Sequence, residues 1–293
     1  MNKKKESLPQ FHEGIVSSNR ILYTASDFAK QSLMYLQEIG ELVANKPHKS
    51  SRDNLSSFLF FIVESGSGKL YYEGEETELE EGDAVFINCS KGYSHETSLN
   101  LWKLKWIHFS GNSVKGIYDK YVERGGQSVL HLKKTEALDN LKKVWEELLN
   151  IAKSDDYIRD MKINTGLSKL TELLMNESWN PEGRGEKSTK RDLSELRRYL
   201  EEHFTEKITL EDLSERFYIN KFYLTRIFKE RYGASIGSYL QNLKITEAKR
   251  KLRFTDFSVQ EIGEECGLGD LAYFSRIFKK VEGISPTEYR NKW

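Results

Sequence analysis

The chain has 293 residues, enough for two domains that each bury a core of their own. Its 45 Lys and Arg balance its 45 Asp and Glu, so net charge by itself is weak evidence about a nucleic-acid partner. Two cysteines without a CxxC pair exclude a disulfide framework, and the longest apolar run, residues 58–63, is far too short to span a bilayer, so we expect a soluble, cytoplasmic protein.

The first part of the chain predicts a mainly β domain. Residues 21–42 are partly helical by their pattern, and we expect this segment to cover the domain that follows. From Leu55 to about Leu132, short β-rich runs alternate with glycine-containing turns, as is typical of a small antiparallel barrel or sandwich. The clearest runs lie at residues 58–63, 69–72, 84–87 and 101–109.

The run at residues 101–109 alternates clearly between two faces. Lysine disfavours an interior, so we predict that the face with the two tryptophans points into the barrel, where a small molecule can bind. That face carries Trp102, Leu104, Trp106 and His108, and the opposite face carries Lys103, Lys105, Ile107 and Phe109.

Residues 133–180 predict two amphipathic helices, each with one apolar stripe. After them, residues 181–190 lose all periodicity and are rich in glycine and charge, which indicates a flexible linker. The first stripe is Leu138, Leu141, Val144, Trp145, Leu148 and Leu149, and the second is Ile163, Leu167, Leu170, Leu173 and Leu174.

An internal repeat follows the linker. Residues 224–233 and 274–283 share the order Arg-Ile-Phe-Lys at a distance of fifty residues. A shorter helical pattern precedes each copy, at residues 210–217 and 259–266. The repeating unit is therefore a helix, a turn and a second helix, and a repeated helix-turn-helix predicts DNA binding.

The second helix of each unit divides into an inner and an outer face. The outer faces carry a hydroxyl, an arginine and a lysine at the same phase; arginine suits guanine in the major groove, and lysine suits phosphate. We predict inner stripes of Leu224, Ile227, Phe228 and Tyr232 in the first copy and Phe274, Ile277, Phe278 and Val281 in the second. The predicted DNA-binding residues are Lys221, Phe222, Thr225, Arg226 and Lys229, then Leu271, Ala272, Ser275, Arg276 and Lys279.

Capping signals agree with these helices. Asn220 and Asp270 are expected to cap the two recognition helices, and Gly233 and Gly283 to end them. A capping box, Ser258 with Glu261, begins the shorter helix of the second unit, whose turn has one more residue than that of the first.

Over roughly its last hundred residues the chain resembles the AraC/XylS family of bacterial transcription regulators. That resemblance implies two helix-turn-helix units joined by a long helix, here at residues 235–254. The chain departs from the family's usual residues at Asn220, Lys244 and Leu268. These differences bear on which DNA sequence the protein prefers. The matching residues include Ala248 to Leu252, Ile262, Gly267 to Asp270, Tyr273 to Arg276, Phe278 to Lys280, Gly283 and Ser285 to Arg290.

The first part resembles the cupin-like sensor that precedes this DNA module in many such regulators, through residues 82–88, His95 and residues 101–111. The two resemblances imply an α+β multidomain chain. Its N-terminal antiparallel β-barrel would sense a ligand over residues 1–132, and residues 133–180 would form a helical dimerisation segment. A linker at 181–190 would lead to an all-α domain with two helix-turn-helix units at 191–293. In the family the helices after the barrel can pair two subunits, but packing on their own barrel is an equal alternative.

The resemblance also implies a ligand site. Trp106 falls where the family has a sugar-stacking tryptophan, and Arg52 matches a position that can contact ligand. With His95, Leu104 and His108 they form our predicted site for a small-molecule effector, which we expect to be a carbohydrate. A non-sugar effector, or none, stays open. Trp102 is expected to be core packing, and His95 could instead satisfy a backbone group.

A cupin enzyme is the alternative from another class. Catalytic cupins usually hold a metal through closely spaced histidines and a glutamate. No histidine lies on the strand at residues 58–64, so we predict no metal, cofactor or catalytic residue. The expected partners are duplex DNA, the effector and a second copy of the chain, with RNA polymerase as a further candidate.

Overall fold

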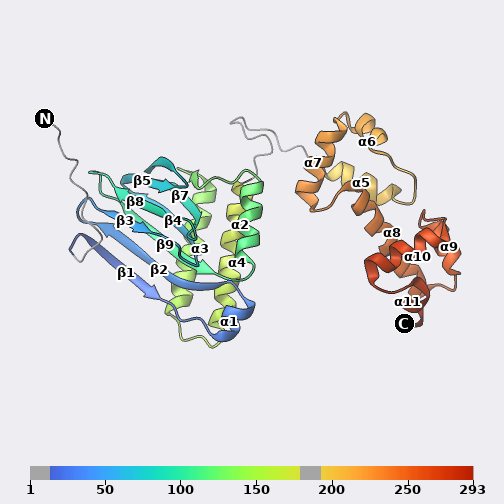
Figure 1. The fold of residues 1–293 in the computed structure, drawn as a ribbon, viewed down its shortest axis with the longest axis horizontal. Helices are drawn as coiled ribbons and strands as arrows, with labels where there is room; N and C mark the ends of the chain where they lie inside the picture. Colours follow the sequence, from blue (N-terminus) through green and yellow to red (C-terminus); the bar gives the residue numbers. More distant parts are fainter. Residues whose placement is uncertain (1–13, 179–192, 293) are drawn as a thin grey trace. The chain divides into compact units, whose positions relative to one another are not determined.

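The computed structural model describes residues 14–178 and 193–292, which fall into two compact units, one up to Arg184 and one from Gly185 on (Figure 1). The predicted linker at residues 181–190 lies outside the described residues.

The first unit consists of two antiparallel sheets and a layer of helices (Figure 1). The six-stranded sheet has the order β1-β2-β9-β4-β7-β10, and the four-stranded sheet has the order β3-β8-β5-β6. The strands are β1 (Val16–Leu22), β2 (Tyr35–Ala44), β3 (Lys49–Arg52), β4 (Phe58–Ser65), β5 (Ser67–Tyr72), β6 (Glu75–Glu80), β7 (Asp83–Asn88), β8 (Tyr93–Thr97), β9 (Lys103–Ser110) and β10 (Val129–His131). The helices are α1 (Asp27–Ser32), α2 (Val114–Glu123), α3 (Glu136–Lys153) and α4 (Arg159–Glu177).

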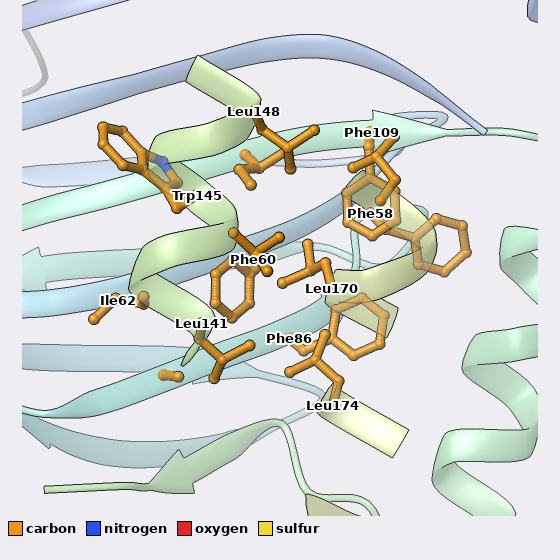
Figure 2. Close-up of a cluster of buried hydrophobic side chains, with 14 of the residues drawn as sticks. Phe58, Phe60, Ile62, Phe86, Phe109, Leu141, Trp145, Leu148, Leu170 and Leu174 are labelled. Atoms are coloured by element: carbon orange, nitrogen blue, oxygen red, sulfur yellow. The ribbon is translucent and has the colours of Figure 1, made fainter. Parts of the chain in front are cut away.

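The central strands of the six-stranded sheet are buried on both faces, which explains the apolar run of β4. Phe58, Phe60 and Ile62 point toward α3 and α4, where they pack with Trp145 and other side chains of the helices (Figure 2). The alternate residues of β4 join a second cluster between the two sheets. Each fully buried phenylalanine contributes about 1.5–3 kcal/mol to stability, so these two clusters hold the three layers together.

The prediction of a partly helical segment at residues 21–42 was mostly wrong. Only the six residues of α1 are helical, and β2 lies in the sheet between β1 and β9. A bulge in β2 between Leu36 and Glu38 shifts its alternation, so Leu36 and Ile39 both reach the helical side. This spacing of three imitates a helix, and the pairing with neighbouring strands overrides it.

The tryptophan face of β9 points between the sheets as predicted, but the reason given for it was wrong. Trp102 and Leu104 belong to the cluster between the sheets, yet Ile107 on the opposite face is also buried, under α3 and α4. Lys105 on that face is only 7% exposed. Its Nζ lies 3.6 Å from Glu64 Oε1, 3.3 Å from Glu146 Oε1 and 4.7 Å from the ring centroid of Trp145. Ion pairs thus allow a lysine into a buried face.

Helices α3 and α4 pack on their own sheet. Leu167 and Leu170 are fully buried beneath it, and the Trp145 indole N–H donates to the Trp106 carbonyl at 3.2 Å. Leu149 and Leu173 are only partly buried at the edge of this cluster. Pairing of two subunits therefore cannot use the buried leucines, and dimerisation stays a prediction that needs other residues.

The second unit is all helical and has two small cores. One cluster is built around Leu224 and Phe228, and the other around Phe274 and Phe278. Its helices are α5 (Ser194–His203), α6 (Leu210–Phe217), α7 (Lys221–Tyr232), α8 (Ile236–Phe254), α9 (Val259–Glu265), α10 (Leu271–Glu282) and α11 (Pro286–Asn291). Helix α8 contributes Ile236 to the first cluster and Ile245, Ala248 and Leu252 to the second, so it joins the two helix-turn-helix units as expected.

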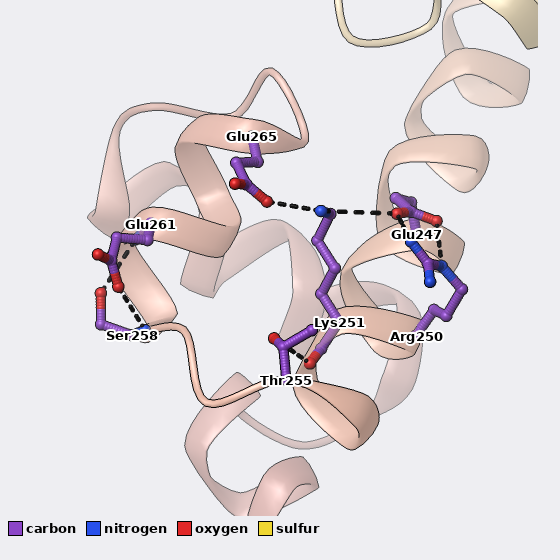
Figure 3. A network of polar contacts seen from close by, with 7 residues as sticks. All are labelled: Glu247, Arg250, Lys251, Thr255, Ser258, Glu261 and Glu265. Atoms are coloured by element: carbon purple, nitrogen blue, oxygen red, sulfur yellow. Dashed lines mark hydrogen bonds and ion pairs between the residues drawn. The ribbon is translucent and has the colours of Figure 1, made fainter.

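The predicted caps are present. Asn220 Oδ1 accepts hydrogen bonds from the N–H groups of Phe222 and Tyr223, and Asp270 accepts one from Tyr273. Ser258 and Glu261 form the capping box of α9 (Figure 3). Gly233 and Gly283 end α7 and α10 in the left-handed conformation.

Val281 was wrongly assigned to the inner stripe of α10, because it is 41% exposed. Tyr289 from α11 packs on Phe278 instead, with ring centroids 5.5 Å apart, and closes this core. Glu282, which follows Val281 in the chain, faces α8 instead. Its Oε2 lies 2.9 Å from Lys249 Nζ.

Candidate nucleic-acid interface and effector cavity

Helices α7 and α10 present matched outer faces. Arg226 and Lys229 on α7 are exposed, as are Arg276 and Lys279 on α10, and the hydroxyl residues Thr225 and Ser275 are half-buried at the same phase. The N-terminal turns differ, since α7 carries Phe222, which is 76% exposed, and α10 carries Leu271, 43% exposed, with Ala272. Lys221 is half-buried, and its Nζ lies 2.7 Å from Glu211 Oε1. The structure thus places all ten predicted residues on the outer sides of the two helices or at their starts.

The two arginines are held in the same way. The Arg226 guanidinium lies 5.4 Å from the Tyr223 ring centroid, and that of Arg276 lies 5.6 Å from Tyr273. Neither arginine forms an ion pair with a described residue, so both are available to an anionic partner.

The basic run on α8 is used differently. Lys251 Nζ lies 2.5 Å from Glu265 Oε2 of α9, and Arg250 pairs with Glu247 of its own helix (Figure 3). Lys249 pairs with Glu282 of α10. Lys249 and Lys251 thus join α8 to its neighbours, and Arg250 is paired within α8. The outer faces of α7 and α10 are therefore the better candidate for contact with DNA.

A cavity of about 380 Å³ opens in the first unit, and it brings together the five residues of the predicted ligand site. Arg52 comes from β3 and His95 from β8, whereas Leu104, Trp106 and His108 come from β9. Both sheets therefore contribute walls. Trp102 is 1% exposed and does not line the cavity, in agreement with its expected core role. Whether the five residues bind a ligand stays a prediction.

The two histidines of the cavity are neutral near pH 7. Burial, with smaller contributions from His48, Arg52 and His108, lowers the pKa of His95 to about 3. Burial and the Arg52 charge lower the pKa of His108 to about 4, and its Nδ1 lies 3.1 Å from Ser57 Oγ.

His95 Nδ1 is buried and has no hydrogen-bond partner among the described residues. The ring borders the cavity beside Phe61 and Trp102, at centroid distances of 5.8 and 5.6 Å. The alternative in which His95 satisfies a backbone group finds no such bond within the described chain. A buried ring nitrogen without a hydrogen-bond partner costs free energy, whichever tautomer the imidazole adopts.

Sequence reasoning missed the part of the wall that β1 and β2 supply. Arg20 and Glu38 line the cavity, and Arg20 Nη1 lies 3.5 Å from Glu38 Oε1. Gly40 on β2 lies directly opposite Trp106 on β9. Glu38 and Gly40 were missed because residues 21–42 were predicted to be partly helical, and Arg20 lies just before that segment. A glycine opposite a tryptophan becomes a signal only once the strands are paired.

The described residues give no support for a metal site. They contain no group of three or more His, Cys, Asp or Glu side chains that could hold a metal ion. Within the same ranges, every helix is too short or too polar to cross a membrane.

Two family models match this chain. A model described as AraC-like ligand binding domain matches residues 44–168, and one described as helix-turn-helix domain matches residues 213–292. The chain belongs to the AraC family of transcriptional regulators. As an AraC-family protein it is a DNA-binding regulator of transcription with a ligand-binding domain.

This AraC-family chain is similar to two curated relatives over most of its length and to a solved DNA-binding domain over its C-terminal third. It is 28% identical over 289 residues to the uncharacterized HTH-type transcriptional regulator YisR of Bacillus subtilis (strain 168), covering 92% of this chain and 96% of that protein. It is 25% identical to the HTH-type transcriptional activator RhaS of Mannheimia succiniciproducens, covering 78% and 85%. The DNA-binding domain of AdpA, solved in complex with a target DNA, is 28% identical over 34% of this chain and 90% of that one, with a TM-score of 0.33.

Proposed function

We propose that this AraC-family regulator is controlled by a carbohydrate bound in the cavity of its first unit. The observation that carries the proposal is that the half-buried Trp106 indole borders this cavity together with Arg52, His95 and His108. An indole offers a flat apolar surface to the C–H face of a sugar ring, and the polar side chains can satisfy its hydroxyls. Neutral imidazoles suit this role because they both accept and donate hydrogen bonds.

The test is calorimetric titration of the full chain with a panel of mono- and disaccharides, with amino acids and aromatic acids as the other ligand classes. We expect saturable binding of a sugar that stabilises the folded protein and is lost in Trp106→Ala. Trp102→Phe is the matched control, because this buried tryptophan does not line the cavity and should leave binding unchanged. Saturable binding of another ligand class, with no heat from any sugar, would favour the alternative of a non-sugar effector.

We further propose that the outer faces of α7 and α10 enter successive major grooves of promoter DNA. Their matched arginines, lysines and hydroxyls support this, because each side chain suits base edges or phosphates and the four exposed cations form no ion pair with a described residue. Action as a cytoplasmic homodimer and contact with RNA polymerase remain proposals based on the family. Sedimentation of the full chain at tens of micromolar tests the first of these.

A further inference from the structure

The cavity has an unbalanced charge. Among the described residues, its charged lining side chains are Arg20, Glu38 and Arg52, and its two histidines are neutral near pH 7. Arg20 and Glu38 form an ion pair at 3.5 Å. The net charge of the lining is therefore +1, and it comes from Arg52.

Arg52 has unused binding capacity. Its Nη1 donates to the Ser51 carbonyl at 2.8 Å, and the residue forms no ion pair with a described residue. It stands at the end of β3 in the four-stranded sheet, whereas Trp106 lies in the six-stranded sheet, so the two side chains border the cavity from different walls. A guanidinium has five N–H donors in a planar fork that matches a carboxylate.

Arg52 is exposed, so its charge stays in contact with water when a neutral sugar binds and gains nothing from that ligand. A carboxylate on the ligand would instead pair with it through charge-assisted hydrogen bonds. A single negative charge balances the lining, whereas a phosphate ester with nearly two charges would reverse its sign. The lining favours a monoanion.

We propose that the effector is a sugar acid, whose carboxylate pairs with Arg52 while its ring stacks on Trp106. This inference rests on the proposed carbohydrate effector and deepens it by naming the charge of the ligand. Ring hydroxyls then face the rings of His95 and His108, which border the cavity as neutral groups.

Matched ligands test the charge directly. The full chain is titrated calorimetrically with D-galacturonate and D-glucuronate, with the parent neutral sugars, and with the uncharged methyl ester of D-galacturonate. We expect at least one acid to bind about ten-fold more tightly than its neutral sugar, and an ester to bind no better than the neutral sugar, because it keeps the ring and loses the charge.

Variants of the chain assign that preference to one residue. Arg52→Gln should remove the ten-fold preference, so that the acid and its neutral sugar bind with equal affinity, and Arg52→Lys should keep part of the preference. Lys49→Gln is the matched control, because it removes a cation from the same strand at a position that does not line the cavity. Thermal unfolding without ligand checks that each variant is folded.

The possible failures are distinguishable. Equal affinity for a neutral sugar and its acid would overturn the sugar acid and leave the carbohydrate effector in place. A preference that survives Arg52→Gln in a folded protein would overturn the assignment to Arg52. Binding confined to benzoate or amino acids would contradict both proposals, as would the absence of heat from the whole panel.

Discussion

Trp106 lies against Gly40, the residue directly opposite it in the neighbouring strand. A Cβ added to Gly40 would come within 2.7 Å of an indole carbon of Trp106 and within 2.7 Å of the Asn19 carbonyl oxygen. The absence of a side chain at Gly40 therefore allows the indole to rest on β2 with its ring bordering the cavity.

We predict that Gly40→Ala displaces the indole and weakens effector binding by about ten-fold or more. Overpacking of this kind also costs about 1–3 kcal/mol of stability. Titration with the effector and chemical denaturation measure the two effects separately. Gly116→Ala in α2 is the control, because its Cβ would meet open space and should leave both quantities nearly unchanged or slightly improve stability. If Gly40→Ala bound the effector with the affinity of the parent protein, the Trp106 indole would not be a ligand contact.

The arginines of α7 and α10 should set base preference. Arg226→Ala and Arg276→Ala should each cost about 1–3 kcal/mol in binding to the specific site and relax preference at one base position. Lys229→Ala should instead weaken specific and random DNA alike and lower the salt dependence by about one phosphate contact. Fluorescence anisotropy at several salt concentrations distinguishes these patterns. If both arginine variants bound the two DNAs as the parent does, the recognition faces would be wrong.

The two turns make a prediction about stability. Tyr218 and Gly267 occupy equivalent places and are both left-handed, with φ of 53° and 70°, and Ile219 and Leu268 follow them into the core. This conformation costs a non-glycine residue about 1–2 kcal/mol, so Tyr218→Gly should stabilise the protein by about 0.5–1 kcal/mol after the added freedom of the unfolded chain is subtracted. Denaturant unfolding measures it, and a destabilised Tyr218→Gly would mean that the tyrosine ring packs more strongly than its 90% exposure indicates.

Gly267→Ala should lower the free energy of unfolding by more than the cost of its left-handed backbone conformation alone. A Cβ there would lie 2.0 Å from the Thr205 carbonyl oxygen, whereas Gly283 has the same sign of φ and open space around it. Gly283→Ala therefore measures the backbone cost of about 1–2 kcal/mol, and Gly267→Ala should exceed it clearly in the same unfolding experiment. If Gly267→Ala and Gly283→Ala lost the same stability, the backbone around Thr205 and Gly267 would be able to shift without cost.

The cavity histidines should make the first unit sensitive to acid. Their pKa values of about 3 and 4 lie below the 6.5 of an unfolded histidine, so the unfolded state binds more protons than the folded state between these limits. Stability is thus fully present above pH 6.5 and is lost as pH falls toward 4. The loss is at most about 1.4 kcal/mol per pH unit for each histidine and is reduced because both rings border an open cavity. Denaturation at pH 7.5, 6 and 5 should show a shallower loss in His95→Gln, and an unchanged slope would contradict the assignment.

Leu170 should matter for folding rather than for subunit pairing. It is fully buried between α4 and the sheet, and Leu170→Asp should destabilise the first unit by about 3 kcal/mol or more, because it buries a charge without a partner (Figure 2). Ser168→Asp, on the exposed side of the same helix, is the matched control and should change stability little. Circular dichroism follows unfolding, and sedimentation shows whether either variant alters the oligomeric state.

Much of the second unit was predictable because its signals are local. Helical periodicity, caps such as Asn220 and Asp270, and terminal glycines act within one or two turns of the chain, so their pattern specifies each helix boundary. The phase of Arg226 and Arg276 followed from the same periodicity. Val281 was the exception, because Tyr289, eight residues later, decides how the second core is closed.

Motifs and periodicity were enough to predict the family, the double helix-turn-helix and the set of five side chains proposed to meet a ligand. The contribution of β1 and β2 to the cavity, and the packing of α3 and α4 on the sheet, became visible only in the folded chain. A bulge before Glu38 disguised the alternation of β2, and both faces of β9 are buried because helices cover the side that carries Lys105. The pairing of Gly40 with Trp106, and of Arg20 with Glu38, joins residues far apart in the chain. Such contacts depend on strand register and packing, which no local pattern of residues specifies.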